Sequence, residues 1–294
     1  MSAPPLPIDL ADRYLELLGV EARNPDDGLL EEIATRHGQR VPFENLTKLR
    51  LHAERSRGPA RRPDDERFVR QRQELGAGDT CFGIAHALGG LLARLGYRAD
   101  WVGARVEGGR SVEDGHVACV VTWRDHPLLV DCGFGAPFFE PLPLERAVAA
   151  RETVVPYARH RLVPAPADRF RMERWDAGTQ AWVVLYHLHA RPRPFDHFHE
   201  RIDESFEPAP DRTFLRGLHA VRNEAERQTA LRTDRVFTTT AAGVEERRLA
   251  GFPEAVTVAE ESLGIARDHT EAAVRALRDG LGVDPFDPER RGGA

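Results

Sequence analysis

Hydrophobic residues recur at the spacing of an α-helix in three stretches near the start of the chain. These stretches run from about residue 9 to 19, from about 26 to 38, and from Cys81 to Leu95. The third is the most apolar, with one face formed by Ile84, Leu88, Leu91, Leu92 and Leu95. A glycine lies at or just past the end of each stretch, which is typical of a helix C-terminus. The pattern therefore predicts an N-terminal group of helices, with Cys81 in the first turn of the last one.

After residue 96 the pattern changes to that of β-strands. Strands are predicted at about 101–106, 117–123, 127–130, 153–163, 169–175 and 182–190. The second and third are joined by a short turn, so they should form a hairpin. His116 then begins one strand and Asp131 follows the other, which brings both residues to the same end of the ladder. Together the strands predict an antiparallel sheet or barrel.

Several segments outside these elements have a polar or mixed character. Residues 55–62 are rich in Arg, Pro and Gly and predict a solvated loop. Residues 41–46, Val-Pro-Phe-Glu-Asn-Leu, predict a packed turn with Glu44 in solvent. Further short strands and helices are predicted around 235–249, 256–263 and 270–277. The tail from residue 288 to 294 is expected to be disordered.

Composition places the chain among ordinary globular proteins. Of its 294 residues 41% are hydrophobic and 30% charged, and no run approaches the roughly 18 apolar residues of a membrane span. The net charge of −6 gives no overall attraction to nucleic acid or to an anionic membrane. Nothing in the chain resembles a phosphate-binding glycine loop, a dinucleotide fingerprint or a nucleic-acid module. Lys48 is the single lysine, and every other basic residue apart from histidine is arginine.

The chain has three cysteines, an odd number, and its first residues have neither a basic segment nor an apolar one of the kind found in secretory signals. We therefore expect a cytoplasmic protein with free thiols. Cys119 and Cys132 lie inside strand patterns and read as inert core residues. Cys81 follows a turn that contains glycine and begins a helix, whose positive end favours the reactive thiolate. A buried core residue is the alternative interpretation of Cys81.

Cys81, His116 and Asp131 occur in the order nucleophile, base and orienting carboxylate. A second group of candidates is formed by the histidines at positions 187, 189, 197 and 199, which make two i, i+2 pairs. Such pairs face one side of a strand and could bind zinc. No cysteine or regular further pair completes a zinc signature, so we expect surface or core histidines and no metal.

Several motifs occur together in the chain, namely Val41 to Leu46, Cys81-Phe82, His116, Asp131 and Gly133-Phe134-Gly135. Through them the chain resembles the arylamine N-acetyltransferase family. Later segments also look similar, namely Leu185-Tyr186 after Trp182 and residues 214–263. The similarity spans nearly the whole chain, with sequence order and approximate spacing kept.

The resemblance implies an α+β fold with three parts and a core like that of cysteine proteases. These are an N-terminal helical bundle carrying the nucleophile (1–96), an antiparallel β-barrel carrying the histidine and the aspartate (97–205), and a C-terminal α/β lid (206–294). It also implies no permanently bound cofactor, with acetyl-CoA or another acyl thioester as co-substrate and a small-molecule amine as acceptor.

For the site, the resemblance implies a ping-pong cycle through a thioester on Cys81. His116 would be the base and Asp131 would fix the imidazole tautomer and stabilise its charged form. The Phe82 backbone N–H at the helix start is a candidate oxyanion donor. Gly133 and Gly135 could let the backbone approach the acyl carrier closely, and Phe134 matches a family position on the acceptor side.

The loop before the cysteine departs from the family pattern. The family reads Arg-Gly-Gly-x-Cys-Phe-Glu, whereas Ala77, Asp79 and Gly83 replace the arginine, one glycine and the glutamate here. Glu44 thereby loses the arginine with which it would pair, unless Arg70 or Arg72 takes its place.

These departures predict a specialised acyltransferase. One alternative is an amide synthase that releases a polyketide chain delivered by an acyl carrier protein. Others are a thiol hydrolase or transglutaminase-like amidase with the same three residues, and a non-catalytic binding homologue.

Overall fold

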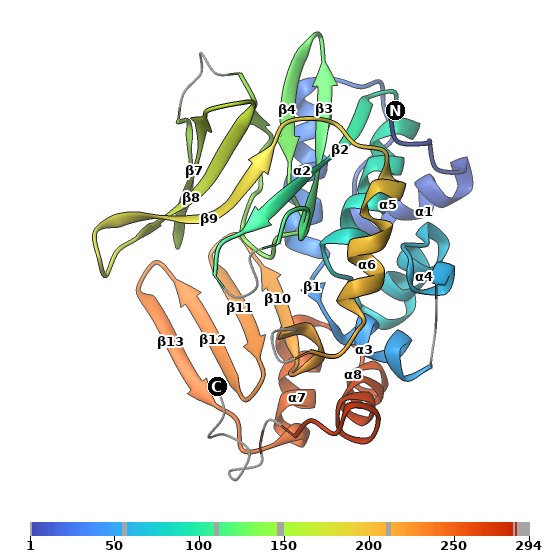
Figure 1. Cartoon of the computed structure of the whole chain (residues 1–294), viewed down its shortest axis with the longest axis vertical. Helices are drawn as coiled ribbons and strands as arrows, with labels where there is room; N and C mark the ends of the chain where they lie inside the picture. The colour runs from blue at the N-terminus through green and yellow to red at the C-terminus, as the bar shows by residue number, and fades with distance from the viewer. Residues whose placement is uncertain are drawn as a thin grey trace.

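A computed structural model describes residues 2–54, 58–108, 112–145, 150–209, 213–284 and 286. It contains two antiparallel sheets and a set of helices. In Figure 1 the helices α1, α4 and α5 gather on one side of the molecule, and the two sheets lie one above the other on the opposite side. The α+β class predicted from the sequence is confirmed.

The N-terminal helices are α1 (Ile8–Leu18), α2 (Asp27–Arg40), α3 (Leu46–Ala53), α4 (Asp65–Leu75) and α5 (Cys81–Arg94). Asp26 and Asp64 cap α2 and α4 by accepting the backbone N–H three residues on. The hydrophobic pattern missed α3 and α4. Helix α4 is mostly polar, with Phe68 and Val69 among the few residues it buries, so its apolar face is too narrow to read from the sequence.

The larger sheet has the strand order β5-β4-β3-β2-β9-β8-β7-β6, with β5 and β6 at its two ends. Its strands are β2 (Arg98–Val106), β3 (His116–Trp123), β4 (His126–Val130), β5 (Leu142–Pro143), β6 (Glu152–Val155), β7 (Ala158–Ala165), β8 (Arg169–Asp176) and β9 (Ala181–His189). The single strand predicted at 153–163 is in fact the hairpin β6–β7. Its turn is formed by Pro156 and Tyr157, so the proline marked a break that the prediction passed over.

From β9 the chain passes through η2 (Phe195–Phe198) into α6 (His199–Ser205), which runs beside α5 in Figure 1. After η3 (Thr213–Leu215) it forms the smaller sheet, of order β1-β10-β11-β12-β13. The strands are β1 (Phe43–Glu44), β10 (His219–Asn223), β11 (Arg227–Arg232), β12 (Arg235–Thr240) and β13 (Gly243–Arg248), and the helices are α7 (Phe252–Leu263), α8 (Arg267–Arg275) and the π-helix η4 (Ala276–Gly280).

The expected turn at residues 41–46 is partly wrong. Phe43 and Glu44 form strand β1, which pairs antiparallel with β10 and so joins the N-terminal segment to the C-terminal sheet. Glu44 is completely buried, not solvated. Within the segment 55–62, residues 58–61 form the 3₁₀ helix η1, whereas residues 55–57 lie outside the described residues, as does the tail from 288 to 294.

Helix α5 is the central element of the largest hydrophobic core. Eleven of its 14 residues are buried, and it contacts β2 and β3 on one side and α1 and α4 on the other. A helix that is apolar almost all round must be enclosed in this way. Its buried position brings its N-terminus, with Cys81, against the larger sheet. No helix among the described residues is both long and apolar enough to cross a membrane.

Candidate active site

Cys81 is the first residue of α5, and its side chain is 7% exposed. Thr80 occupies the N-cap position, but its side chain makes no capping hydrogen bond. Asp79 Oδ1 instead accepts the Thr80 backbone N–H at 2.7 Å. The N–H groups in the first turn of a helix have no partner within the helix. They present a positive end to Cys81 and to any oxyanion formed beside it.

His116 and Asp131 meet because β3 and β4 form a hairpin. Cys119 pairs with Val130 in the register of this hairpin, so the start of β3 lies beside the residues that follow β4. His116 Nε2 is 2.9 Å from Asp131 Oδ2, and both side chains are buried. The prediction that these residues share one end of the ladder is confirmed.

Asp131 is held by further hydrogen bonds. The Tyr186 hydroxyl of β9 donates to Asp131 Oδ2 at 2.8 Å, and the Gly133 backbone N–H donates to Oδ1 at 3.1 Å. Hydrogen bonds to a carboxylate favour its charged form. Both oxygens therefore have donors that fix the plane of the carboxylate and, through it, the orientation of the imidazole.

The surroundings of His116 favour the imidazolium. Burial by itself lowers the pKa of His116, but the Asp131 carboxylate and the hydrogen-bonded Cys81 side chain outweigh it and raise this pKa to about 10. Since Nε2 is bonded to Asp131, Nδ1 is the ring nitrogen left for Cys81. Cys81, His116 and Asp131 thus form one hydrogen-bonded chain from the helix start to the hairpin.

Two aromatic rings pack against the imidazole, and a third packs against both of them. The Phe134 ring lies edge-on to His116 with a centroid distance of 5.2 Å, and the Tyr186 ring lies 5.3 Å away. Phe138 packs against both Phe134 and Tyr186. These apolar faces exclude water from the imidazole and leave its two nitrogens to Asp131 and Cys81.

Gly133 and Gly135 both border the site, and each position favours glycine for a different reason. A Cβ on Gly133 would lie 3.1 Å from the Cys81 Cα, so the missing side chain leaves room for the nucleophile helix itself. Gly135 has a φ of 81°, in the left-handed region that favours glycine, and its carbonyl accepts a hydrogen bond from Gln228 at 3.2 Å. Phe43 borders the same glycine.

Phe82 points into the core beside α6. Its ring contacts Phe198, with 6.4 Å between centroids. Only its backbone N–H, at the start of α5, remains as its predicted contribution to the site.

Glu44 has no arginine partner among the described residues. It accepts hydrogen bonds from the Thr47 backbone N–H at 2.9 Å and from Thr47 Oγ1 at 2.7 Å. Burial, and then the nearby Asp79 carboxylate, raise the pKa of Glu44 to about 7. The expected substitutes do not reach it, since Arg70 is exposed and Arg72 donates to the Gly76 carbonyl.

The two other cysteines lie away from any base. Cys119 Sγ is 3.3 Å from the Ala85 carbonyl and Cys132 Sγ is 3.8 Å from that of Ala34. Burial raises the pKa of both thiols, and Asp131 raises it further. Both cysteines therefore remain protonated, as expected of buried core residues. Cys119 lies in β3 as predicted, whereas Cys132 follows the end of β4 and is not in a strand.

Three of the four histidines considered as zinc ligands contact carboxylates instead, and the fourth, His199, packs against Phe195. His187 contacts Glu107 at 2.9 Å, His189 contacts Glu113 at 3.2 Å and His197 contacts Asp114 at 2.7 Å. The described part of the chain holds no group of three or more His, Cys, Asp or Glu side chains that could bind a metal ion.

A sequence model of the N-acetyltransferase family matches residues 28–272. The chain belongs to the arylamine N-acetyltransferase family. It is therefore an N-acetyltransferase, an enzyme that transfers an acetyl group from acetyl-CoA to an amine. A search of curated protein sequences finds no match.

Solved structures of arylamine N-acetyltransferases have the same fold. The enzyme of Mycobacterium abscessus is 19% identical, with a TM-score of 0.77 over 91% of this chain and 94% of that chain. The enzyme of Nocardia farcinica is 21% identical, with a TM-score of 0.75 over 90% and 92%. The enzyme of Mycobacterium marinum, solved in complex with CoA, is 22% identical, with a TM-score of 0.74 over 91% and 99%.

Tyr186 was not assigned a role from the sequence. It lies in an alternating strand pattern, where a buried tyrosine is most simply a core residue. Its fully buried hydroxyl needs a partner, but nothing in the sequence indicates that the partner is Asp131, 55 residues away. Phe43 and Gln228 were missed for the same reason, since they reach the Gly135 turn from the smaller sheet.

Proposed function

We propose that this enzyme transfers acyl groups by a ping-pong mechanism through a thioester on Cys81. In the first half, the Cys81 sulfur attacks the thioester carbonyl of the donor, acetyl-CoA. The carbon–sulfur bond to CoA breaks, and the leaving thiolate takes the proton that His116 holds. Acetyl-Cys81 and neutral His116 remain.

In the second half, an amine attacks the acetyl carbonyl of the thioester. His116 takes the proton from the attacking nitrogen as the carbon–sulfur bond to Cys81 breaks. The products are the amide, the Cys81 thiolate and the charged imidazole with which the cycle began. Asp131 stabilises the imidazolium and keeps its orientation, and the Phe82 N–H is placed to stabilise the tetrahedral oxyanion.

The observation that carries this proposal is the hydrogen-bonded chain of Cys81, His116 and Asp131. Of the three thiols, only Cys81 lies at a helix N-terminus and beside a base. We also propose that Gly133, Phe134 and Gly135 form the wall that the acyl group and the acceptor contact, since Gly133 borders Cys81 and Phe134 borders His116. The three thiols are free, in keeping with a reducing cytoplasm.

A second candidate is an amide synthase that receives its acyl group from an acyl carrier protein. Its support is the altered loop before the nucleophile, in which Ala77, Asp79 and Gly83 replace the family residues. The chemistry at Cys81 is the same in both cases. The two candidates differ in the donor, which is acetyl-CoA in the first and a long acyl thioester in the second.

Intact mass spectrometry tests these proposals. Wild type and Cys81→Ala are incubated briefly with acetyl-CoA or, separately, with a longer acyl thioester. We expect one acyl group on wild type and none on Cys81→Ala, and the preferred donor separates acetyl transfer from amide synthesis. An adduct that water removes without an amine product indicates a thiol hydrolase or amidase. No adduct with either donor contradicts catalysis at Cys81 and favours a binding homologue.

A further inference from the structure

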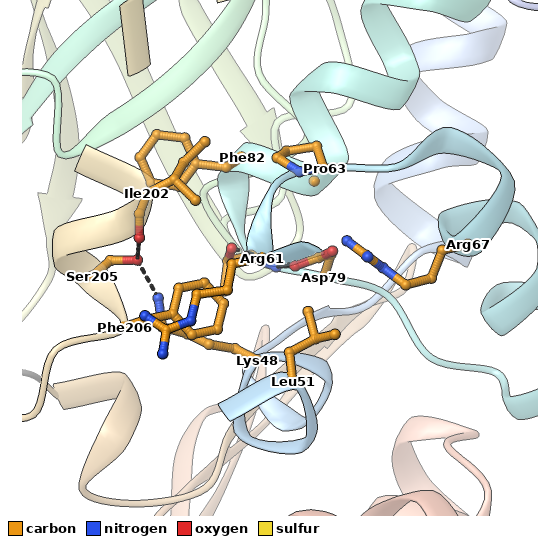
Figure 2. A pocket seen from close by; sticks show the side chains of 12 residues that line it. Lys48, Leu51, Arg61, Pro63, Arg67, Asp79, Phe82, Ile202, Ser205 and Phe206 are labelled. Atoms are coloured by element: carbon orange, nitrogen blue, oxygen red, sulfur yellow. Dashed lines mark hydrogen bonds between the residues drawn. The ribbon is translucent and has the colours of Figure 1, made fainter. Parts of the chain in front are cut away.

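A narrow crevice lies beside the first turn of α5. Thr80, Phe82 and Gly83 line it, together with residues of α3, η1, α4 and α6. Figure 2 shows its charged residues: the Asp79 carboxylate, with the Arg67 side chain extending toward it and the Arg61 and Lys48 side chains nearby.

Asp79 bridges the loop and the helix. Its Oδ1 accepts the Thr80 backbone N–H at 2.7 Å, and a Cβ added to Gly83 would lie 2.3 Å from its Oδ2. The main chain of Asp79 is also fixed, because its carbonyl accepts the Glu44 N–H at 3.1 Å. The carboxylate therefore occupies the space that any side chain at position 83 would need.

This contact explains two departures from the family motif as one change. The resemblance implies a glycine and a glutamate at the two positions where this chain has Asp79 and Gly83. Since the two positions share one space, only one of them has room for a carboxylate, and in this chain it is the loop position. A carboxylate on both positions would clash, and a glycine on both would leave the first turn of α5 without its anionic contact.

The charged groups facing Asp79 come from four elements. Glu44 of β1 is a like charge, while Lys48 of α3, Arg61 of η1 and Arg67 of α4 are cations. Burial raises the pKa of Asp79, and Arg67 and Lys48 oppose that rise. The other charged groups near the start of α5 are His116, which is next to Cys81, and its partner Asp131.

Lys48 holds an unusual position for a lysine. It is the only one among 41 Lys and Arg residues, and it is 5% exposed. Its Nζ donates to Ser205 Oγ and lies 4.3 Å from the centre of the Phe206 ring, where the cation is stabilised by the aromatic face. These contacts with α6 hold a positive charge at the crevice that Asp79 lines.

We propose that Asp79 is a positioning residue that anchors the first turn of α5 and restrains thiolate formation at Cys81, with Arg67 and Lys48 as its counter-ions. The proposal rests on the proposed role of Cys81 as nucleophile. Asp79 and the thiolate compete for the same positive helix end, and two like charges at short range repel each other. The crevice cations moderate this repulsion.

The rate of Cys81 alkylation by iodoacetamide, measured against pH by peptide mass spectrometry, tests the proposal without any acyl donor. Asp79→Asn keeps an acceptor for the Thr80 N–H but removes the charge. We expect it to move the midpoint of the alkylation profile down by about one pH unit. Asp203→Asn, which alters a carboxylate of α6 that pairs with Arg62, is the control and should leave the midpoint unchanged.

Variants that move the carboxylate from position 79 to position 83 provide a second test of the proposal. Gly83→Glu alone places two carboxylates in one space and should slow alkylation about tenfold through displacement of the first turn. The double variant Asp79→Gly, Gly83→Glu restores a single carboxylate and should return the rate to within about threefold of wild type. An unchanged midpoint in Asp79→Asn, or a double variant as slow as Gly83→Glu, overturns the proposal.

The same experiment separates this inference from the proposed function. If Cys81 of wild type is alkylated no faster than Cys119, the nucleophile assignment itself fails. If Cys81 is selectively alkylated but the Asp79 variants behave as wild type, only the role of Asp79 fails.

Discussion

The Tyr186 hydroxyl donates a hydrogen bond to Asp131 Oδ2 at 2.8 Å. It does so from β9, across the larger sheet from the hairpin that carries Asp131. Because the same oxygen receives His116 Nε2, Tyr186 supports the carboxylate that orients the imidazole. The chain of hydrogen bonds from Cys81 therefore extends through His116 and Asp131 to a fourth residue.

Tyr186→Phe should slow acylation of Cys81 about tenfold, because Asp131 loses one of its donors while the ring contacts with His116 remain. The rate is measured by rapid-quench mass spectrometry with a donor that acylates wild type. Tyr157→Phe is the matched control, since its hydroxyl donates to the Glu224 carbonyl, far along the chain from the triad. Equal acylation rates in Tyr186→Phe and wild type would show that this hydrogen bond only gives the buried hydroxyl a partner and does not support the triad.

Asp131→Asn should reduce the acylation rate by about 10² or more. Without the carboxylate, burial dominates and the pKa of His116 falls from about 10 to below its ordinary value. The imidazole is then neutral at pH 8 and no longer offers a positive charge to the Cys81 sulfur. NMR titration of His116 reads the pKa directly.

The control for this variant is Asp125→Asn, an exposed residue in the turn between β3 and β4. It should titrate and react as wild type. A His116 pKa that stays near 10 in Asp131→Asn would contradict the assignment of Asp131 as the main stabiliser of the imidazolium.

Gly133→Ala should slow acylation by about 10- to 100-fold. The added Cβ would lie 3.1 Å from the Cys81 Cα, so either the turn or the start of α5 must shift. Gly280→Ala is the control, since nothing lies within 4 Å of its Cβ position. If Gly133→Ala acylates at the wild-type rate, the turn that contains residue 133 shifts to accommodate the Cβ without moving Cys81.

Glu44→Gln should stabilise the protein at alkaline pH. Between pH 4.5 and about 7 the folded protein keeps a proton on Glu44 that the unfolded chain has released, so stability falls as the pH rises through this range. A pKa raised from 4.5 to about 7 corresponds to a loss of about 3 kcal/mol by pH 8. Glutamine has no charge to bury and avoids this loss.

Urea unfolding at several pH values measures the effect. The difference between Glu44→Gln and wild type should be largest at pH 8 and vanish below about pH 4.5. Glu31→Gln, on the exposed face of α2, should follow wild type at every pH. A difference in unfolding free energy that stays constant across the pH range would mean that Glu44 ionises alike in the folded and unfolded states, and would contradict its raised pKa.

The sequence by itself determined the features that depend on neighbours along the chain. Helical spacing and a following glycine placed Cys81 at the start of α5, and a short turn between two strands placed His116 and Asp131 at one end of a hairpin. These relations follow from the fixed geometry of a helix and of an antiparallel ladder, so residue spacing is enough to predict them.

Only the tertiary structure decided the contacts between distant segments. The start of α5 meets the β3–β4 hairpin, Tyr186 meets Asp131, and Gly83 leaves room for Asp79 because of how α5 is buried and how the loop before it is held. Strand β1 was hidden for the same reason, since two residues show no period and pair with β10 across more than half of the chain. Such contacts arise from close packing of whole elements, which is a property of their surfaces and not of local spacing.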